Sequence, residues 1–131
     1  MRYLLDTNTS IALMRNMGNV VARMAAVLPG DCAISTITSY ELFVGAEKCL
    51  SPSKERMKVE LLQKTVIELP FDLNSAREAG RIRALLESNG QMIGPYDILL
   101  AGHTLSTGLT LVTANVSEFQ RVPALSMENW E

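Results

Sequence analysis

The sequence has 131 residues, of which 47% are hydrophobic and 20% are charged. Its length suits one domain with a sizeable hydrophobic core, and its composition excludes an intrinsically disordered chain. The formal net charge of −2 argues against binding of nucleic acid through a general basic excess, although an acidic metal site can mask a local basic patch in this total.

Short apolar segments alternate with helical patterns along the chain. N-cap residues, prolines and glycines mark where the helices begin and end, as with Asp72 before one long helix and Gly108 after the next. In chain order we expect a strand over 2–5, a helix that starts by 11–14, a helix over 20–28, a strand over 32–35, helices over 36–49 and 54–65, a strand over 66–69, helices over 72–89 and 95–108, a strand over 110–113, a turn or helix over 116–119 and a last short strand within 124–130.

This order of elements predicts the fold class. Short apolar strands that alternate with helices are typical of a parallel sheet covered on both faces. We therefore expect a single α/β domain over residues 1–131, with three α/β/α layers and a short central sheet of four to five parallel strands. In such sheets, ligand sites lie beyond the carboxyl ends of the strands.

The sequence also bears on where the protein acts. No apolar run approaches the ~20 residues that span a bilayer, and Asp6 comes too early for the apolar core of a signal peptide. Cys32 and Cys49 lack the spacing of a redox motif or a zinc site, so we expect buried or half-buried free thiols. We therefore expect a cytoplasmic protein without a membrane partner.

Three acids lie in stretches that otherwise have the composition of buried framework. Asp6 follows the first expected strand, and Asp97 opens the helix that leads to the fourth. Glu41 shares a helical stripe with Ile37 and Val44. An ionised carboxylate in an apolar setting needs a cation, a metal or a proton. Together the three acids predict a divalent metal site at the carboxyl end of the sheet, a setting suited to phosphodiester chemistry.

Each acid also has a purely structural interpretation. Asp6 can cap the helix that follows, although the two polar residues after it could supply that cap. Glu41 could form a salt bridge with an arginine such as Arg81 or Arg83. An acid such as Asp97 in the first turn of a helix is favoured by the helix dipole. The metal-site prediction therefore depends on all three acids meeting in one place.

Three further polar residues have two interpretations each. Asn115 can offer an amide oxygen to a metal or cap a helix, and Glu118 can be a ligand or a solvated turn acid. His103, the only histidine, lies in a helix of buried composition, which favours a hydrogen-bonded structural role over a ligand. A single histidine excludes zinc sites and nucleases that need a histidine pair.

Four segments that contain these residues follow one another in a recognisable order. They are Leu5-Asp6-Thr7-Asn8, then Ser39 to Ala46, then Ile93 to Asp97 with Ala101-Gly102-His103, and finally Leu111 to Asn115 with Glu118-Phe119 and Val122-Pro123. In these segments, and in the ending Glu128-Asn129-Trp130, the chain resembles the PIN-domain ribonucleases, in particular the VapC-type toxins of type II toxin–antitoxin pairs. The resemblance covers nearly the whole chain.

The resemblance implies a PIN-like fold and an endoribonuclease that uses Mg²⁺ or Mn²⁺. Asp6 and Asp97 correspond to the main metal ligands, and Glu41 would bind a second ion or orient and help deprotonate the attacking water. Many PIN domains carry a fourth aspartate where this chain has Asn115. The candidates for a supporting or fourth ligand are Asn115, Glu118, Asn8 and Thr113.

The resemblance also implies a substrate and partners. The substrate would be structured cellular RNA, either tRNA-like or ribosomal, whose cleavage inhibits translation. Three basic residues could hold the RNA backbone, namely Arg15, Lys48 and Arg121. A cognate VapB-type antitoxin would cover the acidic pocket with a basic side chain. The chain would also form a homodimer, with exposed methionines and the helix over 54–65 as plausible contact surface.

Two other classes of protein compete with this interpretation. A phosphatase with an acid after its first strand needs a second acid two residues later, where this chain has Asn8, and a downstream lysine that the sequence does not offer. A non-catalytic PIN-like interaction domain would keep the fold without the chemistry. The three retained acids argue against this second alternative.

Overall fold

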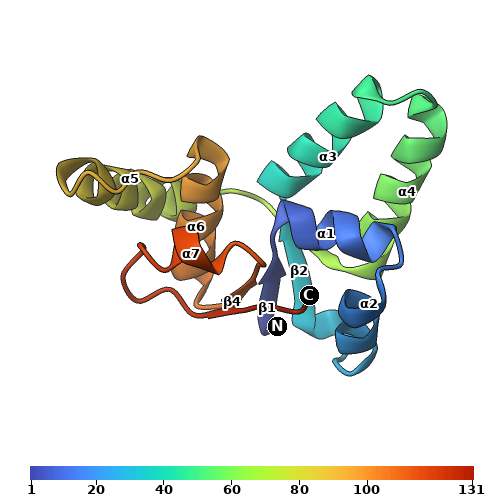
Figure 1. The fold of residues 1–131 in the computed structure, drawn as a ribbon, viewed down its shortest axis with the longest axis horizontal. Helices are drawn as coiled ribbons and strands as arrows, with labels where there is room; N and C mark the ends of the chain where they lie inside the picture. The colour runs from blue at the N-terminus through green and yellow to red at the C-terminus, as the bar shows by residue number, and fades with distance from the viewer.

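A computed structural model describes all 131 residues and places one sheet between two layers of helices (Figure 1). The strands are β1 (Tyr3–Leu5), β2 (Cys32–Ser35), β3 (Ile67–Leu69), β4 (Thr110–Val112) and β5 (Met127–Glu128). They lie in the order β3-β2-β1-β4-β5, and every neighbouring pair is parallel. The predicted α/β/α fold around a short parallel sheet is confirmed.

Seven α-helices and one 3-10 turn connect the strands. They are α1 (Thr7–Met14), α2 (Gly18–Ala25), η1 (Pro29–Asp31), α3 (Thr36–Lys48), α4 (Pro52–Thr65), α5 (Leu73–Ser88), α6 (Pro95–Thr107) and α7 (Val116–Phe119). The helix expected over 20–28 is displaced toward the N-terminus, since α2 begins at Gly18 and ends at Ala25. Helix α4 also begins earlier than predicted, because proline needs no N–H partner in the first turn of a helix. None of the helices is both long and apolar enough to span a bilayer.

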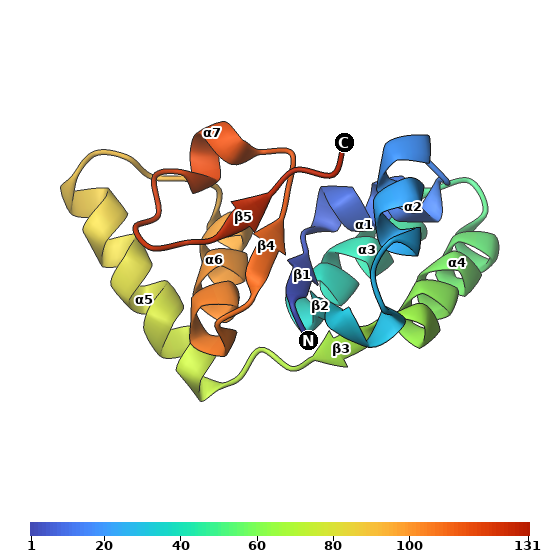
Figure 2. The same ribbon diagram turned by 90° about the horizontal axis from the view of Figure 1, so that it is seen from below.

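The sheet separates two apolar clusters, one on each face. Successive residues of a strand point to opposite faces, so Tyr3 and Leu5 belong to one cluster while Leu4 belongs to the other. Helices α1 to α4 lie on the first side of the sheet, and α5 and α6 lie on the second (Figure 2). Burial of a Leu or Ile side chain contributes about 1.5–3 kcal/mol. Both layers therefore stabilise the sheet on which the candidate site is built.

Helices α5 and α6 approach each other closely at Gly102. A Cβ atom at this position would lie 2.5 Å from the backbone nitrogen of Ala79. The close approach therefore needs glycine, which has no side chain, because a backbone nitrogen at that distance cannot move aside without shifting α5. This contact fixes α6, and with it the position of Asp97 in the first turn of α6.

Residues that were expected to be structural have that role. His103 is 1% exposed, and its Nδ1 lies 2.9 Å from Ser35 Oγ. Burial lowers the pKa of His103, so the ring is neutral at neutral pH. Cys32 is buried and Cys49 half-buried, and both are free thiols. The histidine thus joins α6 to the end of β2.

Candidate metal centre

Asp6 lies directly after β1 and is 5% exposed. Its backbone N–H donates to the carbonyl of Val112 in β4 (3.0 Å), which fixes it between the two central strands. One carboxylate oxygen, Oδ1, accepts a hydrogen bond from the backbone N–H of Thr9 (2.8 Å), so Asp6 caps α1. The expectation that the next two residues would supply this cap is wrong, because both already have helical geometry.

The second carboxylate oxygen of Asp6 has a different environment. No hydrogen bond reaches Oδ2, and the one fully buried side-chain nitrogen or oxygen without a partner in the protein is Nε1 of Trp130. Solvent therefore reaches Oδ2. Capping and ligation are not alternatives for Asp6, since one oxygen serves the helix and the other remains free.

Glu41 lies on α3 and faces the start of α1. Thr7 Oγ1 donates to Glu41 Oε1 (2.7 Å) and lies 3.2 Å from Thr38 Oγ1. Thr7 could not be singled out as a site residue from the sequence, where it was interpreted only as a possible helix cap. The structure assigns it a different contact, in which its hydroxyl holds one oxygen of the Glu41 carboxylate and leaves the other free.

The apolar stripe predicted around Glu41 is wrong by about one position. The buried residues of α3 are Thr38, Ser39, Leu42 and Ala46, so Glu41 lies at the edge of the buried face and is half-buried. The salt bridge considered for it is also absent, because Arg81 pairs with Glu78 and Arg83 with Glu87. Glu41 therefore has no cationic partner in the structure.

Asp97 lies in the first turn of α6 and is half-buried. Burial raises its pKa to about 6, and the negative charges of Glu118, Asp6 and Glu41 add to the shift. A favourable helix dipole would lower the pKa instead, so the dipole does not explain this acid. The residue before the helix leaves room for the carboxylate, because a Cβ at Gly94 would lie 3.3 Å from Asp97 Oδ2.

The segment after β4 brings a fourth acid to this place. Thr113 Oγ1 accepts a hydrogen bond from the backbone N–H of Asn115 (2.9 Å), and Asn115 Nδ2 donates to Glu118 Oε2 (2.9 Å). Asn115 occupies the N-cap position of α7, but its side chain does not cap the helix. It orients Glu118 instead, and Glu118 lies close enough to Asp97 to raise its pKa. Asn8 is exposed and makes no side-chain hydrogen bond.

These groups have the chemistry of a site for a hard cation. Asp6, Glu41, Asp97 and Glu118 supply carboxylate oxygens, the ligands that Mg²⁺ and Mn²⁺ prefer. Their mutual repulsion, visible in the raised pKa of Asp97, is what a bound cation would relieve. The residues therefore have the donor chemistry of a divalent-cation site. However, no three acidic, histidine or cysteine side chains converge on one point in the structure, so the expected meeting of the three acids within reach of one ion is not seen.

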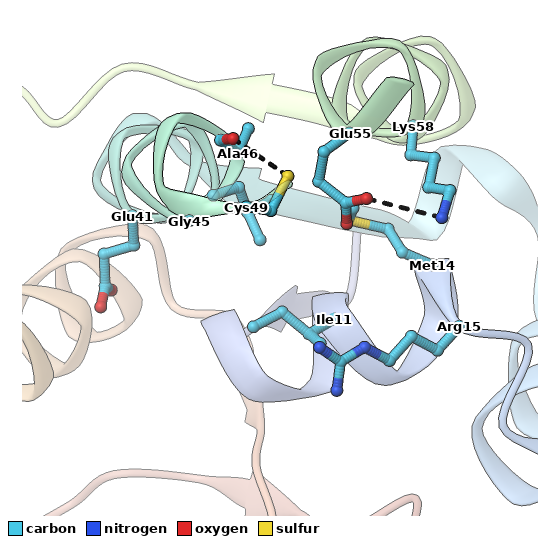
Figure 3. A pocket seen from close by; sticks show the side chains of 10 residues that line it. Ile11, Met14, Arg15, Glu41, Gly45, Ala46, Cys49, Glu55 and Lys58 are labelled. Carbon is cyan, nitrogen blue, oxygen red and sulfur yellow. Dashed lines mark hydrogen bonds and ion pairs between the residues drawn. The ribbon is translucent and has the colours of Figure 1, made fainter. Parts of the chain in front are cut away.

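A cavity of about 340 Å³ lies between α1, α3 and α4, and Glu41 is the one candidate acid among its lining residues. Glu41 lies at one end of it, and the ion pair of Glu55 and Lys58 lies at the other (Figure 3). Arg15, one of the predicted RNA-binding residues, lines the same cavity and forms no ion pair. The structure thus places one free cation on the wall of a cavity that Glu41 also lines.

The other two predicted RNA-binding residues are less well placed. Lys48 is exposed in the last turn of α3. It follows Glu41 by seven residues, about 10 Å along the helix axis. Arg121 is exposed, and its Nη1 donates to the carbonyl of Met92 (2.9 Å). Of the three cations, only Arg15 shares a cavity with one of the acids.

Comparison with known proteins agrees with this geometry. The PIN domain family matches residues 3–125. The chain is 38% identical to the tRNA(fMet)-specific endonuclease VapC of Salmonella typhimurium, over 99% of this chain and 98% of that protein. It is 35% identical, over the same shares, to Ribonuclease VapC2 of Haemophilus influenzae.

Solved structures share the whole fold. DNA-bound VapBC from Salmonella typhimurium has a TM-score of 0.95 and 38% identity, and the match covers 100% of this chain and 99% of that chain. VapBC2 from Rickettsia felis, bound to a fragment of its promoter DNA, has a TM-score of 0.93 and 30% identity, with both chains covered completely.

Proposed function

Because the chain belongs to the PIN domain family, we propose that it is a VapC-type endoribonuclease that depends on Mg²⁺ or Mn²⁺. The observation that carries the proposal is the grouping of carboxylates around Asp97, whose pKa is raised to about 6 by burial and by the acids beside it. Carboxyl groups with strongly raised pKa values are concentrated at sites that bind a ligand or carry out a reaction. This grouping therefore favours a catalytic site over an interaction domain without catalysis.

The proposed roles follow from which oxygens are free. Asp6 and Asp97 would hold the ion, and Oδ2 of Asp6 is available for this because Oδ1 caps α1. Glu41, held at Oε1 by Thr7, would orient the attacking water and accept its proton, or help to hold a second ion. Glu118, oriented by Asn115, would supply the negative charge that a fourth aspartate supplies in many PIN domains. When bound, the divalent ion supplies activation of water and stabilisation of charge on the phosphate.

A structured RNA of the tRNA class is the proposed substrate. The relatives at 38% and 36% identity are both tRNA(fMet)-specific endonucleases, and they align over 99% of this chain. Specific recognition of RNA usually targets unpaired loops with accessible bases. Arg15, which lines the cavity beside Glu41, would hold a phosphate of such a loop. Cleavage of a tRNA would inhibit translation.

The partner we propose is a VapB-type antitoxin, because the matched structures at 38% and 30% identity are VapBC complexes. The cavity between α1, α3 and α4 would receive an apolar side chain of the antitoxin, with a basic side chain directed at Glu41. The exposed Met57 and Leu61 of α4 are the proposed contact surface of a homodimer. Size-exclusion chromatography with light scattering, with and without the antitoxin, tests both assemblies.

The test of the activity compares cleavage of an initiator tRNA transcript by wild type, Asp6→Asn and Asp97→Asn. Asparagine caps a helix as well as aspartate does, so Asp6→Asn removes the charge and keeps α1. Asp72→Asn serves as the matched control, because Asp72 caps α5 and is not among the acids that affect Asp97. We expect cleavage in Mg²⁺ or Mn²⁺ by wild type and Asp72→Asn alone, and none in chelator.

Two outcomes would contradict the proposal. Cleavage that survives both chelator and the substitutions at Asp6 and Asp97 would exclude a metal-dependent site at these residues. A wild-type protein that binds the antitoxin but cleaves no RNA in Mg²⁺ or Mn²⁺ would favour the non-catalytic interaction domain.

A further inference from the structure

Two exposed tyrosines immediately precede two of the acids. Tyr40 comes before Glu41 on α3, and Tyr96 comes before Asp97 on α6. Although they are 56 residues apart in the sequence, their hydroxyl oxygens lie 3.1 Å from each other. The side chains are 51% and 41% exposed. Both rings therefore reach solvent directly beside the candidate metal centre.

The contact between the tyrosines gives the pair a defined shape. The ring centroids are 5.6 Å apart, and the planes are tilted by 50°. A base held between two rings needs a gap of about 7–8 Å, which is twice a carbon–carbon contact distance. The rings are too close for that and not parallel, so a flat ligand can lie only against their outer faces. The pair can thus take one flat ligand on each ring.

The pair is uncharged and lies on the acidic side of the molecule. Tyrosine side chains are neutral at neutral pH, and each of the two immediately precedes an acid of the candidate centre. Neutral aromatic rings add no charge to an acidic site that a polyanion must approach, and they offer contact area that does not depend on salt bridges.

We propose that Tyr40 and Tyr96 form a platform on which unpaired bases of the RNA stack, next to the phosphate held by the carboxylates. The inference rests on the proposed ribonuclease function and specifies which part of the RNA the site binds. Single-stranded RNA is commonly held by stacking of its bases on aromatic side chains, and successive bases can use separate rings. The tilted pair could stack two successive unpaired bases of a loop. It could not stack bases that are paired within a duplex.

The test measures binding to a synthetic RNA hairpin whose unpaired loop has the sequence of a loop of initiator tRNA. It uses the Asp6→Asn background in Mg²⁺, because that change blocks cleavage and keeps the α1 cap. Each tyrosine is changed to Ala and to Phe. A second hairpin carries abasic nucleotides in the loop and keeps every phosphate. Leu28→Ala is the control, since Leu28 is 71% exposed and precedes η1.

We expect Tyr40→Ala and Tyr96→Ala each to weaken binding to the normal hairpin about tenfold, within the range measured for loss of one base–aromatic stack. Tyr→Phe keeps the ring, so it should stay within about twofold of the background. On the abasic hairpin all variants should bind alike. Equal binding of the Ala variants and the background to the normal hairpin overturns the platform, as does an equal loss on both hairpins.

Failure of the platform can be told apart from failure of the proposed activity. Cleavage of the hairpin by the Asp6→Asn protein in Mg²⁺ and in chelator alike would contradict the metal-dependent nuclease, whatever the tyrosines do. Loss of binding that is confined to loops with bases would support the platform even if no metal-dependent cleavage is found. Circular dichroism melting of each variant separates both results from unfolding, because exposed tyrosines contribute little to the core.

Discussion

The starts of α5 and α6 each carry an aspartate, and the two behave in opposite ways. Asp72 accepts hydrogen bonds from the backbone N–H and the hydroxyl of Ser75, both at 2.9 Å, and these bonds lower its pKa. Asp97 has no such partners, because it is the third residue of α6 and the N-cap position is taken by Gly94. Burial and three neighbouring acids raise its pKa to about 6.

The difference shows what distinguishes a structural acid from a site acid. Both aspartates lie at the start of a helix, Asp72 as the N-cap of α5 and Asp97 as the third residue of α6. Asp72 is surrounded by donors, so its charge stabilises the fold. Asp97 is surrounded by carboxylates at the ends of β1 and β4, so its charge destabilises the fold unless a cation or a proton is bound. Asp97 is the place where the fold retains a destabilising carboxylate charge.

The largest expected effect is on cleavage of RNA by Asp97→Asn. Loss of an outer partner of a metal ligand typically costs 10–100-fold, so loss of a ligand itself should reduce kcat/KM for the tRNA by more than about 100-fold. The rate of cleavage in Mg²⁺, compared with that of Asp72→Asn, measures it. A residual rate within a few-fold of wild type would show that Asp97 is no more functional than Asp72.

The stability of the metal-free protein should depend on pH through Asp97. Its pKa is about 6 when folded, against 3.8 for an unperturbed aspartate, so the folded state binds more protons between these values. Stability therefore falls as pH rises from about 4 to about 6 and stays low above that. We expect a loss of about 2 kcal/mol, somewhat less than a full two-unit shift because the group is partly solvated.

Urea denaturation at pH 4, 5, 6 and 7 in chelator checks this dependence. The contribution of Asp97 is the difference between wild type and Asp97→Asn, because the other acids titrate in both. Asp97→Asn should be the more stable protein at pH 7. If the two proteins have parallel pH profiles, Asp97 is not destabilised in the fold and the comparison with Asp72 fails.

The smallest expected effect is at the structural acid. Asp72→Ala removes the cap of α5 and should lower the free energy of unfolding slightly. Because its folded pKa is lowered, the stability that Asp72 contributes is present at neutral pH and is lost as the pH falls through that pKa. Cleavage of RNA per folded molecule should stay unchanged. Thermal melting and a cleavage assay at 25 °C measure the two quantities separately.

The order of the elements could be predicted from the sequence, because apolar strands, caps and turn residues are local signals. Asp72, Gly108 and Pro95 mark helix boundaries in the structure as they do in the sequence. The buried face of α3 could not be predicted in the same way. Its stripe follows Thr38, Ser39, Leu42 and Ala46. Thr38 contacts Thr7 at the start of α1, and Ser39 donates a hydrogen bond to Glu68 of β3.

The acids could be singled out from the sequence, but their contacts could not. Nothing local indicates that Thr7 holds Glu41, since the two are 34 residues apart. Asp6 was expected either to cap or to ligate, and the structure shows one oxygen in the cap and the other free. Tyr40 and Tyr96 were missed as a pair, although each stands next to an acid, because only the packing of α3 near α6 brings them together.

Binding of Mn²⁺, followed by calorimetry at pH 6 in two buffers with different ionisation enthalpies, tests the metal site most directly. A ligand with a pKa of about 6 is half protonated at that pH, so binding should release about half a proton from Asp97. We predict this release in wild type and Asp72→Asn, and loss of binding in Asp97→Asn. Equal affinity for Mn²⁺ in Asp97→Asn and wild type would contradict the assignment of the start of α6 to a metal centre.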